Sequence, residues 1–397
     1  MSNAIKIVII APMREPPAQI NSEQWMIDPN ITYLNHGSFG ARTVDIYETQ
    51  LAYKKQFESS PVHFLDRQRH LVHNARKVVA AFVGAEEAGF GFVENATTGV
   101  GSVMHSLELS KHDEILTTNH VYNGVRQLIK HHCQQNNLLY REVDIQVPIL
   151  SSEAILASLD ENITSSTKLL VIDHVSSSTS VVFPILEIVK LCRNRGILVL
   201  VDGAHAPGML NLDIDALAPD WYVANLHKWV CAPLGAAFVW AKECHRKSIH
   251  PMTISHWHDE GIHAEFDWQG TRDISAWLTS ADAVRAGDFY GWSRIREHNH
   301  QMVLWMQDQL LDAWGVESLT PLDGSMLGSM ATVPLPQGAP SDIETCLAVR
   351  DYLYEKHAIE VPVIPFHGRG MVRISCQLYS KPVDITVLIS AIKEIKS

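Results

Sequence analysis

The chain has 397 residues, of which 46% are hydrophobic and 19% are charged, so it is large enough to bury a substantial core in two structural domains. Its formal net charge is −12, and the acidic excess is dispersed, which argues against nucleic acid and against an anionic membrane surface as partners. Any phosphate that the protein binds must therefore be held by a local site.

The six cysteines are scattered and include no CxxC pair, which is typical of reduced thiols in a cytoplasmic protein. An apolar stretch, Ile5–Ala11, is cut off by Pro12 and Arg14 and is shorter than a membrane span or a usual signal core. We interpret this stretch as part of an N-terminal tail or as an edge strand.

From about residue 75 the sequence alternates helical patterns with short β-rich runs. This alternation predicts an α/β fold with a mostly parallel, seven-stranded sheet between helices. A helix is predicted from Ile185 to Arg195, because Pro184 precedes it and Gly196 follows it. The predicted strands are Phe90–Val93, Glu114–Thr118, Tyr140–Val143, Leu169–Val175, Leu198–Asp202, Trp221–Ala224 and Ala236–Trp240.

After residue 275 the pattern changes to longer helices and a closing segment, which predicts a smaller α+β domain. Pro382 can start the last helix, whose apolar face is predicted to comprise Ile385, Leu388, Ile389, Ile392 and Ile395. We expect a tail over residues 1–20, a segment over 21–45 that packs with the small domain, a large domain over 46–275 and a small domain over 276–397.

The segment Glu94–Gly99 follows a predicted strand and precedes the helical run Val100–Leu107. A helix N-terminus presents unpaired N–H groups and a partial positive charge, which suits a phosphate group. Ordinary capping by Asn95 or Thr97 would explain the same residues. The segment alone therefore leaves both interpretations open.

Asp202 ends one apolar strand and Lys228 follows the next, an arrangement that suits pyridoxal 5′-phosphate (PLP). The carboxylate would keep the pyridine nitrogen protonated, and the amine would form a Schiff base. Asp202 could instead cap a turn and His205 could be a structural histidine, but both follow a strand where such sheets bind ligands. Lys228 lies between the apolar runs Tyr222–Leu226 and Trp229–Pro233, and burial there would lower its pKa.

The motifs Asp202–His205 and Asn225–Trp229 resemble those of the class V aminotransferase superfamily of fold type I PLP enzymes, in its isopenicillin N epimerase-like and cysteine desulfurase-like branch. The resemblance extends from Tyr33–Gly40 to Val372–Ser375, nearly the whole chain. It implies a fold type I PLP-transferase with PLP as cofactor and an amino acid as substrate. It also implies a homodimer with shared active sites.

The resemblance further implies a role for each matching residue. Lys228 is implied to be the Schiff-base lysine, Asp202 the partner of the pyridinium nitrogen and His205 a cofactor contact beside it. Ser177 is implied to hydrogen-bond the phenolic oxygen of the cofactor. The residues implied to hold the phosphate are Ala96, Thr97, Asn225 and His227, joined by Gly270 and Thr271 of the neighbouring subunit.

Arg373 matches the family arginine that binds the substrate α-carboxylate, a task that suits a planar guanidinium, although alone it could be an ordinary surface arginine. Asn35 and His36 are implied to contact the substrate as well. The aromatic residue over the cofactor should come from residues 119–123. We favour Tyr122, since a phenol can stack and also transfer a proton, with His120 as the alternative.

Cysteine desulfurases of this superfamily carry a reactive cysteine shortly before the carboxylate-binding arginine, and residues 362–373 contain none. The resemblance therefore favours removal of a Cα proton by Lys228, through an external aldimine and a quinonoid, without a persulfide on the enzyme. We predict an isopenicillin N epimerase-like epimerase or a C–S lyase, to which ergothioneine-pathway sulfoxide lyases look similar. A class V aminotransferase is the alternative.

A metal-dependent hydrolase is an alternative of another class, because the chain has 21 histidines. His256, His258 and His263 are metal-ligand types, and imidazoles two residues apart on a strand share a face. No HExxH spacing appears, however, and the cluster precedes the Gly270–Thr271 segment. We interpret the cluster as an entrance or dimer loop and predict no metal site.

Overall fold

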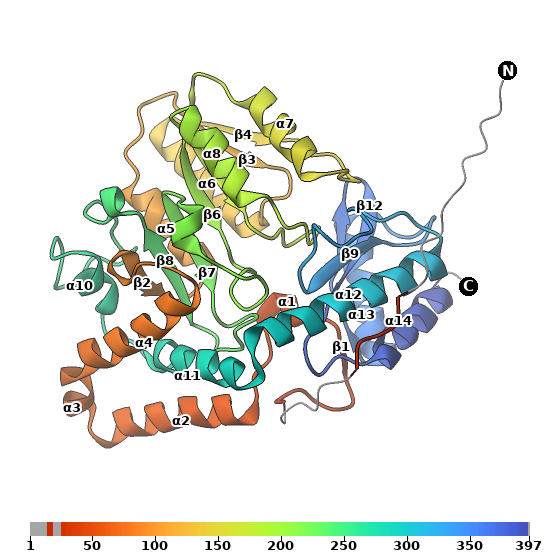
Figure 1. Cartoon of the computed structure of the whole chain (residues 1–397), viewed down its shortest axis with the longest axis horizontal. Coiled ribbons are helices and arrows are strands. Elements are labelled where there is room, and N and C mark those ends of the chain that lie inside the picture. The colour runs from red at the N-terminus through yellow and green to blue at the C-terminus, as the bar shows by residue number, and fades with distance from the viewer. Residues whose placement is uncertain (1–13, 19–24, 396–397) are drawn as a thin grey trace.

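The computed structural model describes residues 14–18 and 25–395 and is shown in Figure 1. The predicted segment Ile5–Ala11 lies outside these residues. The strands are β1 (Thr32–Tyr33), β2 (Phe90–Val93), β3 (Glu114–Thr118), β4 (Leu139–Val143), β5 (Thr167–Asp173), β6 (Leu198–Asp202), β7 (Trp221–Asn225), β8 (Ala237–Ala241), β9 (Met330–Pro334), β10 (Ile359–Glu360), β11 (Val363–Phe366) and β12 (Arg369–Ser375). The helices are α1 (His36–Phe39), α2 (Val44–Ser59), α3 (Pro61–Asp66), α4 (Gln68–Phe82), α5 (Ala96–Ser106), α6 (Asn123–Asn136), α7 (Ser152–Asn162), α8 (Ile185–Asn194), α9 (Ile214–Leu217), α10 (Ile262–Asp267), α11 (Ser275–Tyr290), α12 (Trp292–Trp314), α13 (Ile343–His357) and α14 (Pro382–Ile395), with 3-10 helices η1 (Glu87–Gly89) and η2 (Glu243–His245).

The large sheet has seven strands in the order β2-β8-β7-β6-β5-β3-β4, which confirms the predicted sheet. Strands β4, β3, β5, β6 and β7 are parallel, whereas β8 runs antiparallel to both β7 and β2. Three predicted strands match to the residue. Strand β5 ends at Asp173 rather than at Val175, because the ladder with β6 ends at the pair Asp173 and Asp202.

Both faces of this sheet are buried, because successive side chains of a strand point to opposite faces. In β6, Val199 and Val201 pack in one core cluster with residues of α4, α8 and α11. Leu200, between them, packs in a second cluster with residues of α5 and α6. The near-continuous apolar runs of the sequence therefore reflect a sheet that is covered by helices on both sides.

A smaller unit contains the antiparallel sheet β11-β12-β9, and Figure 1 shows its blue elements gathered at one end of the molecule. Strand β1 pairs in parallel with β10, and the Leu34 carbonyl accepts a 2.9 Å hydrogen bond from the Ser375 amide. Helix α11 packs on α2 and α4, while α12 packs on β9 and α14. We therefore propose a domain boundary near Gly291, rather than the predicted boundary at 275/276.

Two helices, α8 and α14, can be compared with the helices that the sequence predicts. Helix α8 begins at Ile185 and α14 begins at Pro382, as predicted. Ile385, Leu388 and Ile392 are buried, but Ile395 is exposed because α14 extends past the core at its end.

None of the helices in the described part of the chain combines the length and the apolar character that a bilayer crossing requires. The six cysteines are all free thiols. The cytoplasmic location stays a prediction.

The N-terminal segment lies against the backbone that carries Lys228. The two ring nitrogens of His36 bond to the Lys228 carbonyl at 3.0 Å and to the Tyr379 hydroxyl at 2.9 Å. Gly40 has φ of 73°, and a Cβ atom there would lie 2.0 Å from the His227 carbonyl oxygen. Only glycine combines this conformation with so close an approach.

We expect Gly40→Ala to destabilise the protein by about 3 kcal/mol, since it adds steric overlap to the conformational penalty of a positive φ. The matched control is Gly196→Ala, because Gly196 also has a positive φ of 68° but open space around its Cβ position. That control should lose about 1 kcal/mol. The free energy of unfolding in urea measures both, and equal losses would show that the contact with residues 227–228 is not restrictive.

Candidate active site

Lys228 lies two residues beyond Leu226, where the chain leaves strand β7, and its side chain is only partly accessible. Its Nζ atom lies 3.1 Å from His205 Nε2. The surroundings lower the Lys228 pKa to about 7, chiefly through burial and then through the charge of Arg373, against opposing effects of Asp202 and Asp173. At neutral pH a substantial fraction of this lysine is therefore the free amine, the form that attacks an aldehyde.

His205 is placed to hydrogen-bond that amine. The Trp229 indole N–H, which can only donate, points to His205 Nδ1 at 3.5 Å. Burial, reinforced by the charge of Lys228, lowers the His205 pKa well below its ordinary value. We therefore assign neutral His205 its proton on Nε2, from which it donates to the Lys228 amine.

Asp202 and Asp173 occupy paired positions at the carboxyl ends of β6 and β5. Asp202 accepts a 3.0 Å hydrogen bond from the Ala204 amide, whereas Asp173 Oδ2 is buried without a hydrogen-bond partner in the described residues. Burial and then the charge of Asp202 raise the Asp173 pKa well above its ordinary value. We assign the proton of this pair to Asp173 and the negative charge to Asp202.

Sequence reasoning missed Asp173. The predicted strand ran through this residue to Val175 and so hid the carboxyl group that ends β5. The available signal was the position of Asp173 at the end of a central strand, one strand away from Asp202.

Three of the residues that the resemblance implies for the phosphate, Ala96, Thr97 and Asn225, meet where helix α5 begins. The Ala96 amide donates to Asn225 Oδ1 at 2.8 Å, which ties the start of α5 to the end of β7, and Thr97 follows in the first turn. His227 is 7% exposed, and its Nδ1 has no hydrogen-bond partner in the described part of the chain. An unpaired buried nitrogen two residues after Asn225 fits an anionic group such as the PLP phosphate.

Arg373 is buried and is held by neutral groups. Its Nη1 donates to the Ser177 carbonyl at 2.8 Å and to the Ser177 hydroxyl at 3.1 Å. Its Nη2 donates to Ser38 Oγ at 2.7 Å and to Asn35 Oδ1 at 3.2 Å. Burial lowers the Arg373 pKa to about 10. A buried guanidinium whose acceptors are all neutral is suited to bind a carboxylate ligand.

Tyr122 and His120 differ sharply in accessibility. Tyr122 is 48% exposed at the start of α6. Burial lowers the Arg373 pKa, and Tyr122 has a smaller effect that raises it. His120 is fully buried, with Nδ1 2.6 Å from Thr179 Oγ1 and Nε2 3.0 Å from the Ile145 carbonyl. These contacts do not suit His120 to stack on the cofactor, and the stacking role of Tyr122 stays a prediction.

The N-terminal segment departs from its predicted role in one respect. His36 has a protein partner on each ring nitrogen, and burial lowers its pKa to about 3. We therefore infer that His36 positions the Lys228 backbone rather than binding substrate. Asn35 and Ser38 instead hold Arg373, and Ser38 was not singled out from the sequence. The predicted contact of Ser177 with the phenolic oxygen of the cofactor stays a prediction.

Gly270 and Thr271 lie in an accessible segment. Gly270 has φ of 91°, Thr271 is exposed, and the adjacent Arg272 forms an ion pair with Glu94, just before the phosphate-binding segment. Their contact with a neighbouring subunit stays a prediction.

The three histidines proposed for a hydrolase site do not converge. His263 Nε2 lies 2.9 Å from a backbone carbonyl oxygen, and His256 stacks on an indole ring. His258 lies instead 3.5 Å from the carboxylate of Glu265. The geometry therefore gives no support to a metal-dependent hydrolase built on this trio.

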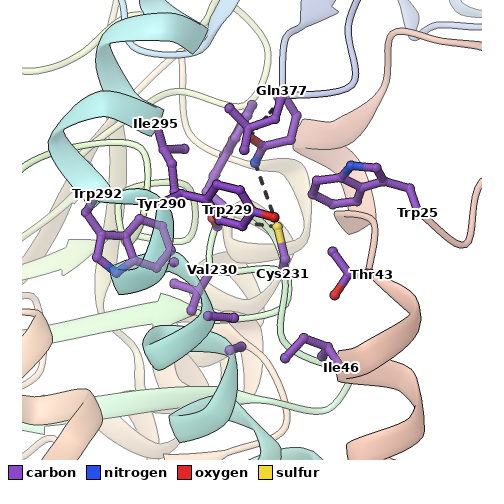
Figure 2. A pocket seen from close by; sticks show the side chains of 14 residues that line it. Trp25, Thr43, Ile46, Trp229, Val230, Cys231, Tyr290, Trp292, Ile295 and Gln377 are labelled. Carbon is purple, nitrogen blue, oxygen red and sulfur yellow. Dashed lines mark hydrogen bonds between the residues drawn. The ribbon is translucent and has the colours of Figure 1, made fainter. Parts of the chain in front are cut away.

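A separate pocket lies beside residues 229–231 (Figure 2). Its walls are mostly apolar and include Trp25 and Trp292, and the amide of Gln377 donates to Cys231 Sγ at 3.7 Å. Lys228, Asp202 and Arg373 do not line it. These walls therefore offer no charged partner for the carboxylate of an amino acid.

A buried lysine with a lowered pKa, close enough to an aspartate at the carboxyl end of a mostly parallel sheet to feel its charge, is the arrangement expected of a fold type I PLP enzyme. The family model for aminotransferase class V matches residues 41–388, so the chain belongs to that family, and PLP is its cofactor. With PLP bound at this site, Lys228 would form the Schiff base and Asp202 would face the ring nitrogen. Asn225, His227 and the start of α5 would hold the phosphate.

The chain is 30% identical to a probable L-cysteine desulfhydrase, chloroplastic, of Arabidopsis thaliana, over 94% of this chain and 85% of that protein. It is 28% identical to isopenicillin N epimerase of Amycolatopsis lactamdurans, over 94% of this chain and 97% of the relative. Among solved structures, a mutant of C-DES with glycine covalently linked to the PLP cofactor has a TM-score of 0.80 at 20% identity, covering 92% of this chain and 96% of its own. That likeness shows the shared fold.

The lowered Lys228 pKa predicts how the apo protein takes up PLP. Only the neutral amine attacks the aldehyde, so the attachment rate should rise about tenfold per pH unit below pH 7 and level off above it. Arg373→Gln should shift the midpoint to higher pH, because it removes a charge that lowers the Lys228 pKa. Stopped-flow absorbance measures both rates, and a wild-type rate that keeps rising towards pH 10 would contradict the lowered pKa.

Proposed function

We propose that the protein is a C–S lyase that cleaves the Cβ–S bond of a cysteine-type amino acid and yields pyruvate, ammonia and a thiol or sulfide. The single observation that carries an amino acid substrate is the buried Arg373 guanidinium, held only by neutral acceptors next to Lys228. The similarity to a named L-cysteine desulfhydrase over most of both chains supports the choice of a C–S lyase.

Arg373 would bind the α-carboxylate of the substrate. Nη1 and Nη2 each already donate to two neutral acceptors, whereas the Nε–H is buried without a partner in the described residues; a carboxylate would accept from Nε–H and would displace one neutral acceptor to gain a second hydrogen bond. The backbone carbonyl of Ser177 and the side chains of Asn35 and Ser38 hold the guanidinium in place. Binding of the carboxylate by Arg373 would position the substrate Cα near the Lys228 amine.

Lys228 would then remove the Cα proton. The cofactor, when bound, supplies an electron sink that makes this proton acidic. His205 keeps its own pKa well below that of the amine, through burial and the charge of Lys228, so it does not compete for the proton. The negative charge on Asp202 would favour the protonated ring nitrogen.

The fate of the sulfur distinguishes a lyase from a persulfide-forming desulfurase. Residues 362–373 span β11 and most of β12 and contain no cysteine. Cys346 and Cys376, the nearest cysteines in sequence, are both buried, and burial raises the pKa of each thiol. These observations support departure of the sulfur with the substrate fragment rather than its capture by the enzyme.

Epimerisation is the second candidate, and the placement of Tyr122 favours it. The half-exposed phenol lies near enough to Arg373 to affect its pKa. From there Tyr122 could return a proton to Cα, or could protonate the departing sulfur in the lyase reaction. The 28% identity to an isopenicillin N epimerase supports the same alternative.

We also propose that the protein works as a homodimer with shared sites. The half-buried Gly270, the exposed Thr271 and the ion-paired neighbour Arg272 support this arrangement, because Thr271 is accessible to another chain.

A panel of L-cysteine, cystine and S-substituted cysteines, incubated with the holoenzyme in D2O, tests the reaction. We expect pyruvate and ammonia in equal amounts, together with the released sulfur compound. Deuterium at Cα without pyruvate would indicate an epimerase, and a 2-oxo acid that retains the side chain would indicate an aminotransferase. The absence of both products and Cα exchange over a broad amino acid panel would contradict the proposal.

Arg373→Lys should weaken substrate binding about 100-fold, because an ammonium group cannot replace two aligned hydrogen bonds. PLP affinity should change less than twofold. The matched control is Arg369→Lys, since Arg369 is exposed on the same strand. Substrate KM and PLP titrations measure the two affinities, and an equal loss of both would show that Arg373 is structural.

A further inference from the structure

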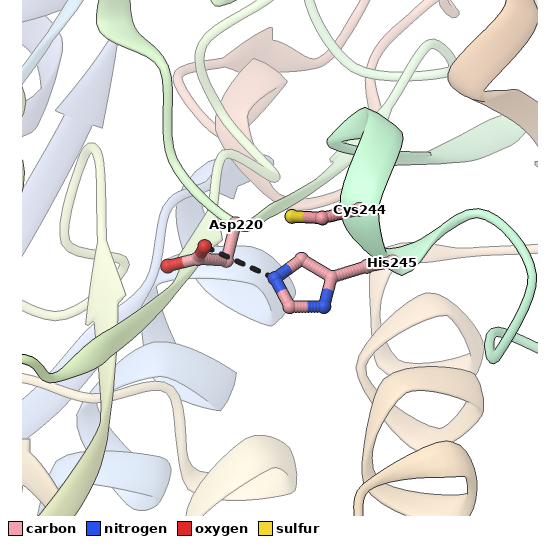
Figure 3. Close-up of side chains that lie close together, drawn as sticks. All are labelled: Asp220, Cys244 and His245. Atoms are coloured by element: carbon pink, nitrogen blue, oxygen red, sulfur yellow. Dashed lines mark hydrogen bonds and ion pairs between the residues drawn. The ribbon is translucent and has the colours of Figure 1, made fainter.

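Three side chains of metal-ligand type lie close together, as Figure 3 shows, and they lie at the start of β7, whereas Lys228 follows the end of that strand. Asp220 immediately precedes β7, whereas Cys244 and His245 belong to η2, just after β8. One ligand atom from each residue lies within 4.8 Å of the other two. The antiparallel pairing of Trp221 with Ala241 brings these two segments together.

Two of the ligands already have a suitable separation. Asp220 Oδ1 lies 3.1 Å from His245 Nε2. Oxygen and nitrogen ligands at about 2.0–2.1 Å from a tetrahedral zinc ion are roughly 3.3 Å apart. An ion could therefore replace the present hydrogen bond with little movement of either side chain.

Neighbouring residues also hold the Asp220 and His245 side chains in place. Asp220 Oδ2 accepts a 2.8 Å hydrogen bond from the Val199 amide, and the His245 ring lies 4.3 Å from the Trp221 ring. Such outer contacts commonly fix the ligands of metal sites. Lys242 adds a 3.0 Å backbone hydrogen bond to the Asp220 carbonyl, which holds η2 beside β7.

We propose that Asp220, Cys244 and His245 bind one zinc-type divalent ion, with water as the fourth ligand. Cys244 is exposed, and Figure 3 shows its thiol pointing towards Asp220, so a small side-chain rotation would bring the sulfur into coordination. Binding would release the thiol proton and would require the histidine proton to reside on Nδ1. A carboxylate, a thiolate and an imidazole together suit zinc better than magnesium or calcium.

The ion would act as a clamp rather than as a catalyst. Strand β7 separates Asp220 from Asn225, and five residues of strand span roughly 17 Å. The ion would join the start of β7 to the segment after β8, and the other ends of these two strands flank the lysine segment. The proposal is therefore independent of the PLP reaction, and either can fail without the other.

Cobalt titration of the chelator-treated holoenzyme tests the site. We expect one equivalent of Co2+ to produce a thiolate charge-transfer band in the near ultraviolet, and Zn2+ to displace it. Cys244→Ser should abolish the band, and Asp220→Asn should weaken binding more than tenfold. His258→Ala should leave the band intact, which controls for a second group of ligand types, His250, His258 and Asp259.

Alkylation provides a second readout, because Cys244 is the exposed cysteine of the chain. Zn2+ should slow iodoacetamide modification of Cys244 at least tenfold in the wild type, and by less than twofold in His245→Ala, as located by mass spectrometry. Absence of the cobalt band together with unprotected Cys244 would overturn the proposal. A band that survives Cys244→Ser would also overturn it.

Discussion

Arg373 is buried among four neutral acceptors, and a charge in that position costs several kcal/mol unless an anion joins it. The acceptors come from two distant parts of the chain, Asn35 and Ser38 before the large sheet and Ser177 after β5. The N-terminal segment, the small unit and the large sheet must therefore assemble before the proposed carboxylate site can form. The same charge helps burial to lower the Lys228 pKa, so carboxylate binding would make Lys228 a stronger base when substrate is present.

The ends of the central strands supply the other half of the site. Asp202 and Asp173 occupy paired strand positions, and burial followed by the charge of Asp202 raises the Asp173 pKa well above its ordinary value, which favours the negative charge on Asp202. His205 remains neutral and faces Lys228, because burial and the lysine charge both disfavour its protonation. The strand order thus determines the protonation states on which amino acid chemistry at Cα would depend.

Strand positions and the Asp202–Lys228 pair were predictable because they depend on local patterns: continuous apolar runs and residues that directly follow them. The contacts of His36 and His120 were not predictable. Nothing in a single sequence shows that the Tyr379 hydroxyl would hydrogen-bond the His36 ring, or that the Thr179 hydroxyl would hydrogen-bond the His120 ring. Asp173 was missed for a related reason, since the neighbour of a strand is determined by the sheet order. The domain boundary that we propose near Gly291 likewise depends on which elements α11 contacts.

The measurement that tests this account most directly is borohydride reduction of the PLP-loaded protein, followed by location of the modified peptide by mass spectrometry. The account predicts a visible cofactor band that reduction abolishes, with the pyridoxyl group attached to Lys228 alone and absent from Lys228→Ala. Attachment to another lysine, or no cofactor band after PLP is added, would contradict it.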